Sequence, residues 1–137
     1  MTMTEHIMLK SIDQPRKKDV YEDINWICNS MGFVSGRDVE DTALRIFDDI
    51  VNIIAMRQDV TSQHIAEDLE VTVNTVNHHL RNFSASGFFV RRSNVILLRG
   101  GSMRRTIEEI KRDADRMFED LIMIADEVDN VLKIENR

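Results

Sequence analysis

The feature that most limits the possible folds of this chain is an apolar stripe near its C-terminal end. Apolar residues recur there at alternating intervals of three and four over more than three heptads: Ile107, Ile110, Ala114, Met117, Leu121, Ile124, Val128 and Val131. This is the a and d pattern of a coiled coil, and the residues beside it are mostly charged. One helix cannot bury such a stripe against itself, so a partner surface is needed.

The stripe therefore predicts a helix of about 30 residues from Ser102 onward, roughly 45 Å long. Thr106 and Glu109 have the spacing of a capping box, which predicts that the regular part begins at Thr106. We expect residues 101–137 to form a dimerisation helix that pairs with a second copy of the chain. Its orientation, parallel or antiparallel, stays open, and packing within its own chain is the alternative.

Composition supports a mostly helical, single-domain protein. Five Gly and one Pro in 137 residues supply little turn chemistry, which favours long helices over an all-β fold. The longest apolar run, Leu121 to Ala125, is far too short to span a membrane. The single cysteine, Cys28, forms no intrachain disulfide and fits a reducing compartment. We therefore expect a cytoplasmic protein without membrane contact.

The first half of the chain shows weaker signals. Residues 1–14 lack periodicity and are expected to form a flexible tail. Pro15 suits the first turn of a helix that Gly32 would end, and Asp38 is placed to cap a second helix. The apolar positions expected on these two helices are Val20, Ile24, Ile27 and Met31, then Ala43, Leu44, Phe47, Ile50, Val51 and Ile54.

Two short helices and a hairpin follow. Thr61 is a good cap for a helix over 62–69, and Thr72 for one over 73–85, whose inward positions are Val76, Leu80 and Phe83. Beyond Gly87, two β-prone runs at 88–92 and 95–99 flank a very short turn, which predicts a hairpin. The predicted fold is mainly α with a small β-hairpin wing: a winged helix-turn-helix at 15–100 and a long C-terminal coiled-coil helix.

Charge is distributed unevenly over this chain, whose formal net charge is -6. Between Glu70 and Glu108 there is no acidic residue, whereas six arginines occur there: Arg81, Arg91, Arg92, Arg99, Arg104 and Arg105. The rest of the chain holds 24 acidic and only 12 basic residues. A concentrated basic segment in an acidic chain predicts a surface that binds phosphate, as in nucleic-acid recognition. A chance clustering of surface arginines is the alternative.

The segment 61–90 resembles the winged helix-turn-helix of the ArsR and MarR superfamily of bacterial and archaeal transcriptional regulators. Within it, Thr75-Val76-Asn77-His78-His79-Leu80 resembles the recognition-helix signature of the ArsR type, and Arg81 to Val90 resembles the helix end, glycine and first wing strand. The resemblance implies a DNA-binding regulator whose recognition helix, about 73–85, enters the major groove. The wing, 88–99, would contact phosphates or the minor groove.

The side-chain types on the expected outward face suit this role. Asn can pair with adenine, Arg can read guanine or hold phosphate, and a helix N-terminus favours a phosphate. The predicted DNA-binding residues are Ser62, Gln63, Thr72, Asn74, Thr75, Asn77, His78, Arg81, Arg91, Arg92 and Arg99. His79 is expected to be half-buried, and for Arg104 and Arg105 a role in wing contacts and simple solvation stay equally open.

No set of residues suggests catalysis or a cofactor. The histidines lack a ligand pattern with carboxylates, Gly100-Gly101 lacks the lysine of a phosphate-binding loop, and Cys28 has no base beside it. We therefore expect no enzyme activity, metal or cofactor, and predict a dimeric, sequence-specific DNA-binding transcriptional regulator whose partners are double-stranded DNA and a second copy. The alternative is a winged-helix scaffold for protein–protein interaction that does not touch DNA.

Overall fold

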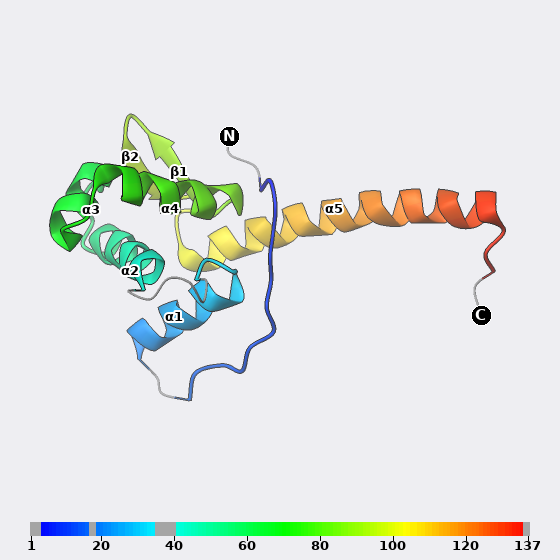
Figure 1. Cartoon of the computed structure of the whole chain (residues 1–137), viewed down its shortest axis with the longest axis horizontal. Helices are drawn as coiled ribbons and strands as arrows, with labels where there is room; N and C mark the ends of the chain where they lie inside the picture. The colour runs from blue at the N-terminus through cyan, green and yellow to red at the C-terminus, as the bar shows by residue number, and fades with distance from the viewer. Residues whose placement is uncertain (1–3, 17–18, 35–40, 136–137) are drawn as a thin grey trace.

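The computed structural model describes residues 4–16, 19–34 and 41–135, and it is mainly helical, as expected. Four helices and a two-stranded antiparallel hairpin gather at one end of the molecule, and a long C-terminal helix projects from them (Figure 1). The elements are α1 (Val20–Ser30), α2 (Thr42–Ala55), α3 (Ser62–Leu69), α4 (Val73–Ala85), β1 (Phe89–Arg92), β2 (Val95–Leu98) and α5 (Met103–Leu132).

The bounds of α3 and α4 agree with the sequence prediction because their capping residues are decisive. The Thr61 hydroxyl accepts a hydrogen bond from the His64 N–H at 3.2 Å, and the Thr72 hydroxyl accepts one from the Thr75 N–H at 3.1 Å. Between the helices Glu70 adopts a left-handed conformation (φ 55°), which turns the chain sharply. Two consecutive helices are thus held at a short, defined turn.

The hairpin is also as predicted. Phe89 lies opposite Leu98 and Arg92 opposite Val95, which leaves Ser93 and Asn94 as a two-residue turn. Both turn residues have positive φ, the backbone that matches the right-handed twist of a two-stranded ribbon.

Four buried phenylalanines join the hairpin to the helices. Phe47 of α2 contacts Phe83 of α4 and Phe88 just before β1, with ring centroids 5.4 and 5.0 Å apart, and Phe89 completes the group. The expected inward face of α4, which includes Val76 and Leu80, is confirmed as buried. This cluster fixes the angle between α4 and β1, and therefore which side of α4 faces solvent.

Two expected helix starts are wrong. Asp19, not Pro15, precedes the first turn of α1, because its carboxylate accepts the Tyr21 N–H at 2.8 Å. Ser102 caps α5 by accepting the Arg105 N–H at 3.1 Å, whereas Thr106 lies buried one turn inside the helix and accepts the Gly100 N–H at 3.0 Å. The expected cap Asp38 lies outside the described residues.

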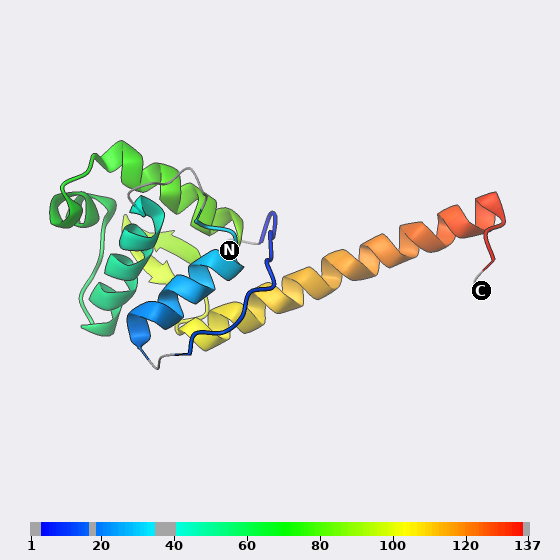
Figure 2. The ribbon, with the colours of Figure 1, turned by 60° about the horizontal axis from the view of Figure 1, so that its bottom comes forward.

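Residues 4–14, expected to be a flexible tail, lie extended across α5 and beside α1, and we call them the strap (Figures 1 and 2). The Glu5 N–H donates to the Ala85 carbonyl at 2.7 Å, and the Lys10 N–H donates to the Ser30 carbonyl at 2.8 Å. The Trp26 indole donates to the Ile12 carbonyl at 3.0 Å. Backbone hydrogen bonds of this kind leave no periodic signature in a sequence, which is why the pattern of residues did not reveal them.

A buried ion cluster fastens the strap, the hairpin and α5 to one another. Arg99, which follows β2, lies 2.7 Å from the Asp113 carboxylate of α5 and 3.1 Å from that of Glu109. Thr4 of the strap donates its N–H to Asp113 at 3.2 Å and accepts from Arg99 at 3.1 Å. Burial would raise the pKa of Asp113, but hydrogen bonds from Arg99, Thr4 and Arg116 outweigh it and hold the pKa well below its ordinary value.

We expect Asp113→Asn to destabilise the protein by about 3 kcal/mol, because it leaves a buried guanidinium without its closest carboxylate. Asp115→Asn on the same helix is the matched control, since the ion pair of Asp115 with Lys111 is exposed and contributes less than about 1 kcal/mol. Urea unfolding followed by circular dichroism measures both. Equal losses for the two variants would show that the buried cluster carries no special weight.

Candidate nucleic-acid interface

The outward face of α4 is polar and contains no acidic residue. Asn74, His78 and Arg81 are exposed, and Thr75 is half-buried near the N-terminal cap. The capping hydroxyl of Thr72 also lies 2.9 Å from the Thr75 hydroxyl, so both are engaged at the first turn. Side chains that can read base edges therefore stand on one helix face whose opposite side is anchored in the phenylalanine cluster.

The hairpin is tied to this face through the Asn77 side chain. Its amide oxygen accepts from the Ser62 hydroxyl at 2.7 Å and from the Arg91 guanidinium at 2.6 Å, and Arg91 donates to the Ser62 hydroxyl as well. Desolvation lowers the pKa of Arg91 from its very high ordinary value. Three residues predicted to contact DNA are thus brought together, but they bond to one another and join α3, α4 and β1 into one surface.

Two of the predicted contact residues are not available at the surface. Ser62, which was expected to contact the DNA backbone, is only 9% exposed, and its hydroxyl donates to the Asn77 side chain instead. The Arg99 side chain is 6% exposed within the ion cluster and cannot reach a phosphate as expected for a wing residue. The buried guanidinium of Arg99 keeps its carboxylate partners because an unpaired charge in the interior would destabilise the fold.

The remaining predicted residues lie on α3, α4 and β1 or at the cap of α4, and we treat them as the candidate interface. A groove of about 280 Å³ runs beside the second half of α4 and is lined by Asn77, Leu80, Arg81, Ser84 and Arg91. Gln63 at the start of α3 and Arg92 at the end of β1 are both exposed. His79, expected to be half-buried, is so, and its ring stacks 6.4 Å from that of Phe83.

A second, larger cleft lies between the hairpin and α5, and sequence reasoning missed it. It has a volume of about 590 Å³ and is lined by Val90, Arg91, Arg92, Arg99, Glu109, Arg112, Asp113 and Arg116. Five arginines and two carboxylates line the cleft, and both carboxylates pair with Arg99. The lining therefore has a net positive charge. Arg112 and Arg116, one helical turn apart, could have indicated a basic surface on this helix. In the sequence they are indistinguishable from the other charged residues beside the apolar stripe.

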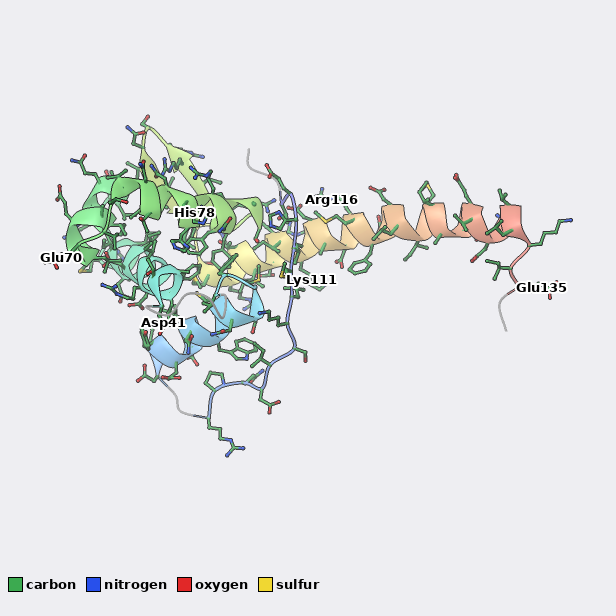
Figure 3. The ribbon with its side chains drawn as sticks, in the orientation of Figure 1. Asp41, Glu70, His78, Lys111, Arg116 and Glu135 are labelled. Carbon is green, nitrogen blue, oxygen red and sulfur yellow. The ribbon has the colours of Figure 1, made fainter. Side chains whose placement is uncertain are left out.

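The apolar stripe of α5 divides into a covered and an uncovered part. Ile110 is buried against the rest of the chain, and Ala114 and Met117 are half-buried. The members that are exposed are Ile107, Leu121, Ile124, Val128 and Val131, joined by Phe118, Ile122 and Met123. Figures 2 and 3 show that the second half of α5 extends beyond every other element. Within the described residues, most of the predicted seam is thus exposed.

Two carboxyl groups, Asp49 of α2 and Asp68 of α3, interact where these helices meet. Desolvation and a hydrogen bond with Asp68 of α3 raise the pKa of Asp49 in α2 to about 6, although His64 partly offsets this. The His64 ring nitrogen Nε2 lies 3.6 Å from a carboxylate oxygen of Asp68. Two carboxyl groups this close cannot both ionise without cost, so the α2–α3 contact depends on pH.

Within the described parts of the chain, no group of three or more histidine, cysteine or acidic side chains could hold a metal ion, and no helix has the length and hydropathy to cross a membrane. Cys28 is fully buried, and burial raises the pKa of its thiol. The thiol therefore packs as an apolar group on the buried side of α1.

Comparison of the chain with protein-family models, with curated proteins and with solved structures gave no match. The residues and their geometry are therefore the whole basis for a functional proposal.

We expect Asp49→Asn to stabilise the protein at pH 7 and to have little effect near pH 4. The fold raises the pKa of Asp49 above its ordinary value of 3.8, so the wild-type protein loses stability as the pH rises from about 4 to about 6. The amide imitates the protonated acid and removes this loss. Thermal unfolding at pH 4, 5, 6 and 7 measures it, with Asp59→Asn, an exposed carboxylate, as control. A difference that shrinks as the pH rises would contradict the assignment.

Proposed function

We propose that this protein is a dimeric, sequence-specific DNA-binding transcriptional regulator built on a winged helix-turn-helix. The observation that carries the proposal is the acid-free, exposed face of α4, with Asn74 and Arg81, which the hydrogen bond between Asn77 and Arg91 joins to the hairpin. A helix of this kind fits the major groove of DNA, and an adjacent hairpin fits the neighbouring backbone.

In this proposal each side chain has a defined task. Asn74 and Arg81 read base edges, since amide and guanidinium groups pair bidentately with adenine and guanine. The first turn of α4 presents free N–H groups and a positive dipole end to a phosphate. Arg92 at the hairpin tip contacts the backbone or the minor groove, while Arg91 holds the hairpin at a fixed distance from α4.

The exposed half of α5 supports the dimeric part of the proposal. Leu121, Ile124 and Val131 are each more than half exposed, which is uncommon for a row of large apolar side chains on one helix face. A second copy covers such a row, and two-fold symmetry then presents two α4 helices to two half-sites of a palindrome. The same row is also compatible with the alternative, a scaffold that binds other proteins and no DNA, and DNA binding separates the two.

We expect the protein to bind a specific fragment of genomic DNA, selected from a genomic library, and Asn74→Ala with Arg81→Ala to weaken this binding by at least tenfold. Each bidentate base contact contributes about 1–3 kcal/mol of discrimination. Arg104→Ala is the matched control, because this arginine belongs to the same acid-free stretch but pairs with Glu108 on α5. Fluorescence anisotropy gives the affinities. Equal losses in the variant and the control, or no selection of DNA at all, would favour the scaffold.

Affinity should also fall steeply with salt. If a dimer engages about 6–10 phosphates, the association constant drops about 10³–10⁵-fold between 50 and 200 mM salt. A flat dependence would exclude a phosphate-binding surface.

Asn77→Asp should separate stability from DNA binding. The new carboxylate still accepts from Ser62 and Arg91, and its hydrogen bond with the guanidinium becomes an ion pair, so unfolding by urea should be unchanged or shifted to higher concentration. The same charge faces the DNA phosphates and should reduce affinity more than tenfold. Asn77→Ala provides the comparison, since it breaks the contact without adding charge. Full DNA affinity in Asn77→Asp would place the interface elsewhere.

A further inference from the structure

Two exposed apolar surfaces lie at different ends of the described chain. One is the distal half of α5 (residues 117–132), where Phe118, Leu121 and Ile122 are more than 60% exposed. The other is the strap, where Met8 and Leu9 are 60% and 66% exposed. The strap crosses the proximal half of α5 (residues 103–116) in both views of the ribbon (Figures 1 and 2). Within one chain the distal half of α5 does not return to the strap.

Charge divides along α5 in the same way. The distal half contains five acidic residues and no basic one, namely Glu119, Asp120, Asp126, Glu127 and Asp129. The proximal half carries Arg112 and Arg116 at the cleft and Lys111 on the other side of the helix, as Figure 3 shows for Lys111 and Arg116. The proximal half also contains four acidic residues, Glu108, Glu109, Asp113 and Asp115, and these pair with Arg104, Arg99, Arg116 and Lys111. Arg105 and Arg112 are its basic residues for which no ion pair is found among the described residues. The distal half is therefore strongly acidic, whereas the proximal half has five basic and four acidic residues and a small net positive charge.

We propose that two copies of the chain pair with their α5 helices antiparallel, so that the distal half of each lies along the proximal half and strap of the other. This inference rests on the homodimer proposed above and settles its orientation. Antiparallel pairing places the acidic half of each helix beside basic residues of its partner. A parallel pair would set each acidic half against its own copy and leave the strap uncovered.

The spacing of the stripe fits this orientation except at Ile110, which its own chain covers. An antiparallel pair packs each a position against a d position of the partner. With the two-fold axis at Glu119, Met117 of one chain faces Leu121 of the other, Ala114 faces Ile124, and Ile107 faces Val131. Ile110 is already covered by its own chain, so near that layer the last turns of the partner pack on Ile107 and the strap. The apolar contact then extends from the distal halves of both helices to Ile107 and the strap, whereas a parallel pair buries only about two heptads.

Site-specific cross-linking of the full chain tests the orientation. The variants are Ile107→Cys, Val131→Cys and the double variant, treated with a short bismaleimide, with the wild-type chain as control because its Cys28 is buried. Positions 107 and 131 are about 36 Å apart on one helix, so the reagent cannot link them within a chain. Analytical ultracentrifugation of each variant reports whether a dimer forms at all.

We expect a dimer in every case, a covalent dimer for most of the double variant, and none for either single variant. A covalent dimer from Val131→Cys alone would show parallel helices and overturn the inference, while the homodimer would stand. A dimer that none of the variants cross-links would overturn the full-length pairing in the same way. Monomers throughout would overturn both proposals and assign the exposed face to a different protein.

Discussion

The buried contact between Arg99 and Asp113 is the interaction on which the arrangement of this molecule depends. It lies where the end of the hairpin, the proximal half of α5 and the strap meet, and it is almost completely shielded from water. At low dielectric a hydrogen-bonded salt bridge is directional, so it orients the elements it joins. The direction in which α5 leaves the rest of the chain, and with it the geometry of any dimer, follows from this contact.

The arginines of the acid-free stretch illustrate how one residue type takes different tasks. Arg99 is a buried partner of two carboxylates, Arg91 joins the hairpin to α4 through Asn77, and Arg92 and Arg81 stay exposed. Arg91 is exposed as well, but its guanidinium is engaged by Asn77 and Ser62, and the Arg99 side chain is buried, so the interface we propose carries less free charge than the composition of the stretch suggests. Its strength is the fixed relation of hairpin and helix, which positions the charge that remains.

Local signals predicted the elements near the candidate interface well. Thr61 and Thr72 cap their helices, Val76, Leu80 and Phe83 are buried, and the turn at Ser93-Asn94 forms, because capping, periodicity and turn chemistry act over a few residues. The errors arose where a distant segment decided the outcome. Ser62 and Arg99 have the residue types of a polar surface, but Ser62 bonds to Asn77 and Arg99 pairs with Asp113. The strap shows no periodicity because its hydrogen bonds come from the backbone.

By itself the sequence determined the helical class, the bounds of α3 and α4, the hairpin and the existence of a long helix with an apolar stripe, since each depends on residues close together in the chain. Only the tertiary structure decided which arginines reach solvent, where the stripe is covered, and that a basic cleft lies between hairpin and α5. These properties depend on which side chains meet across long sequence separations, and the burial of a charge is set by the partner it finds there.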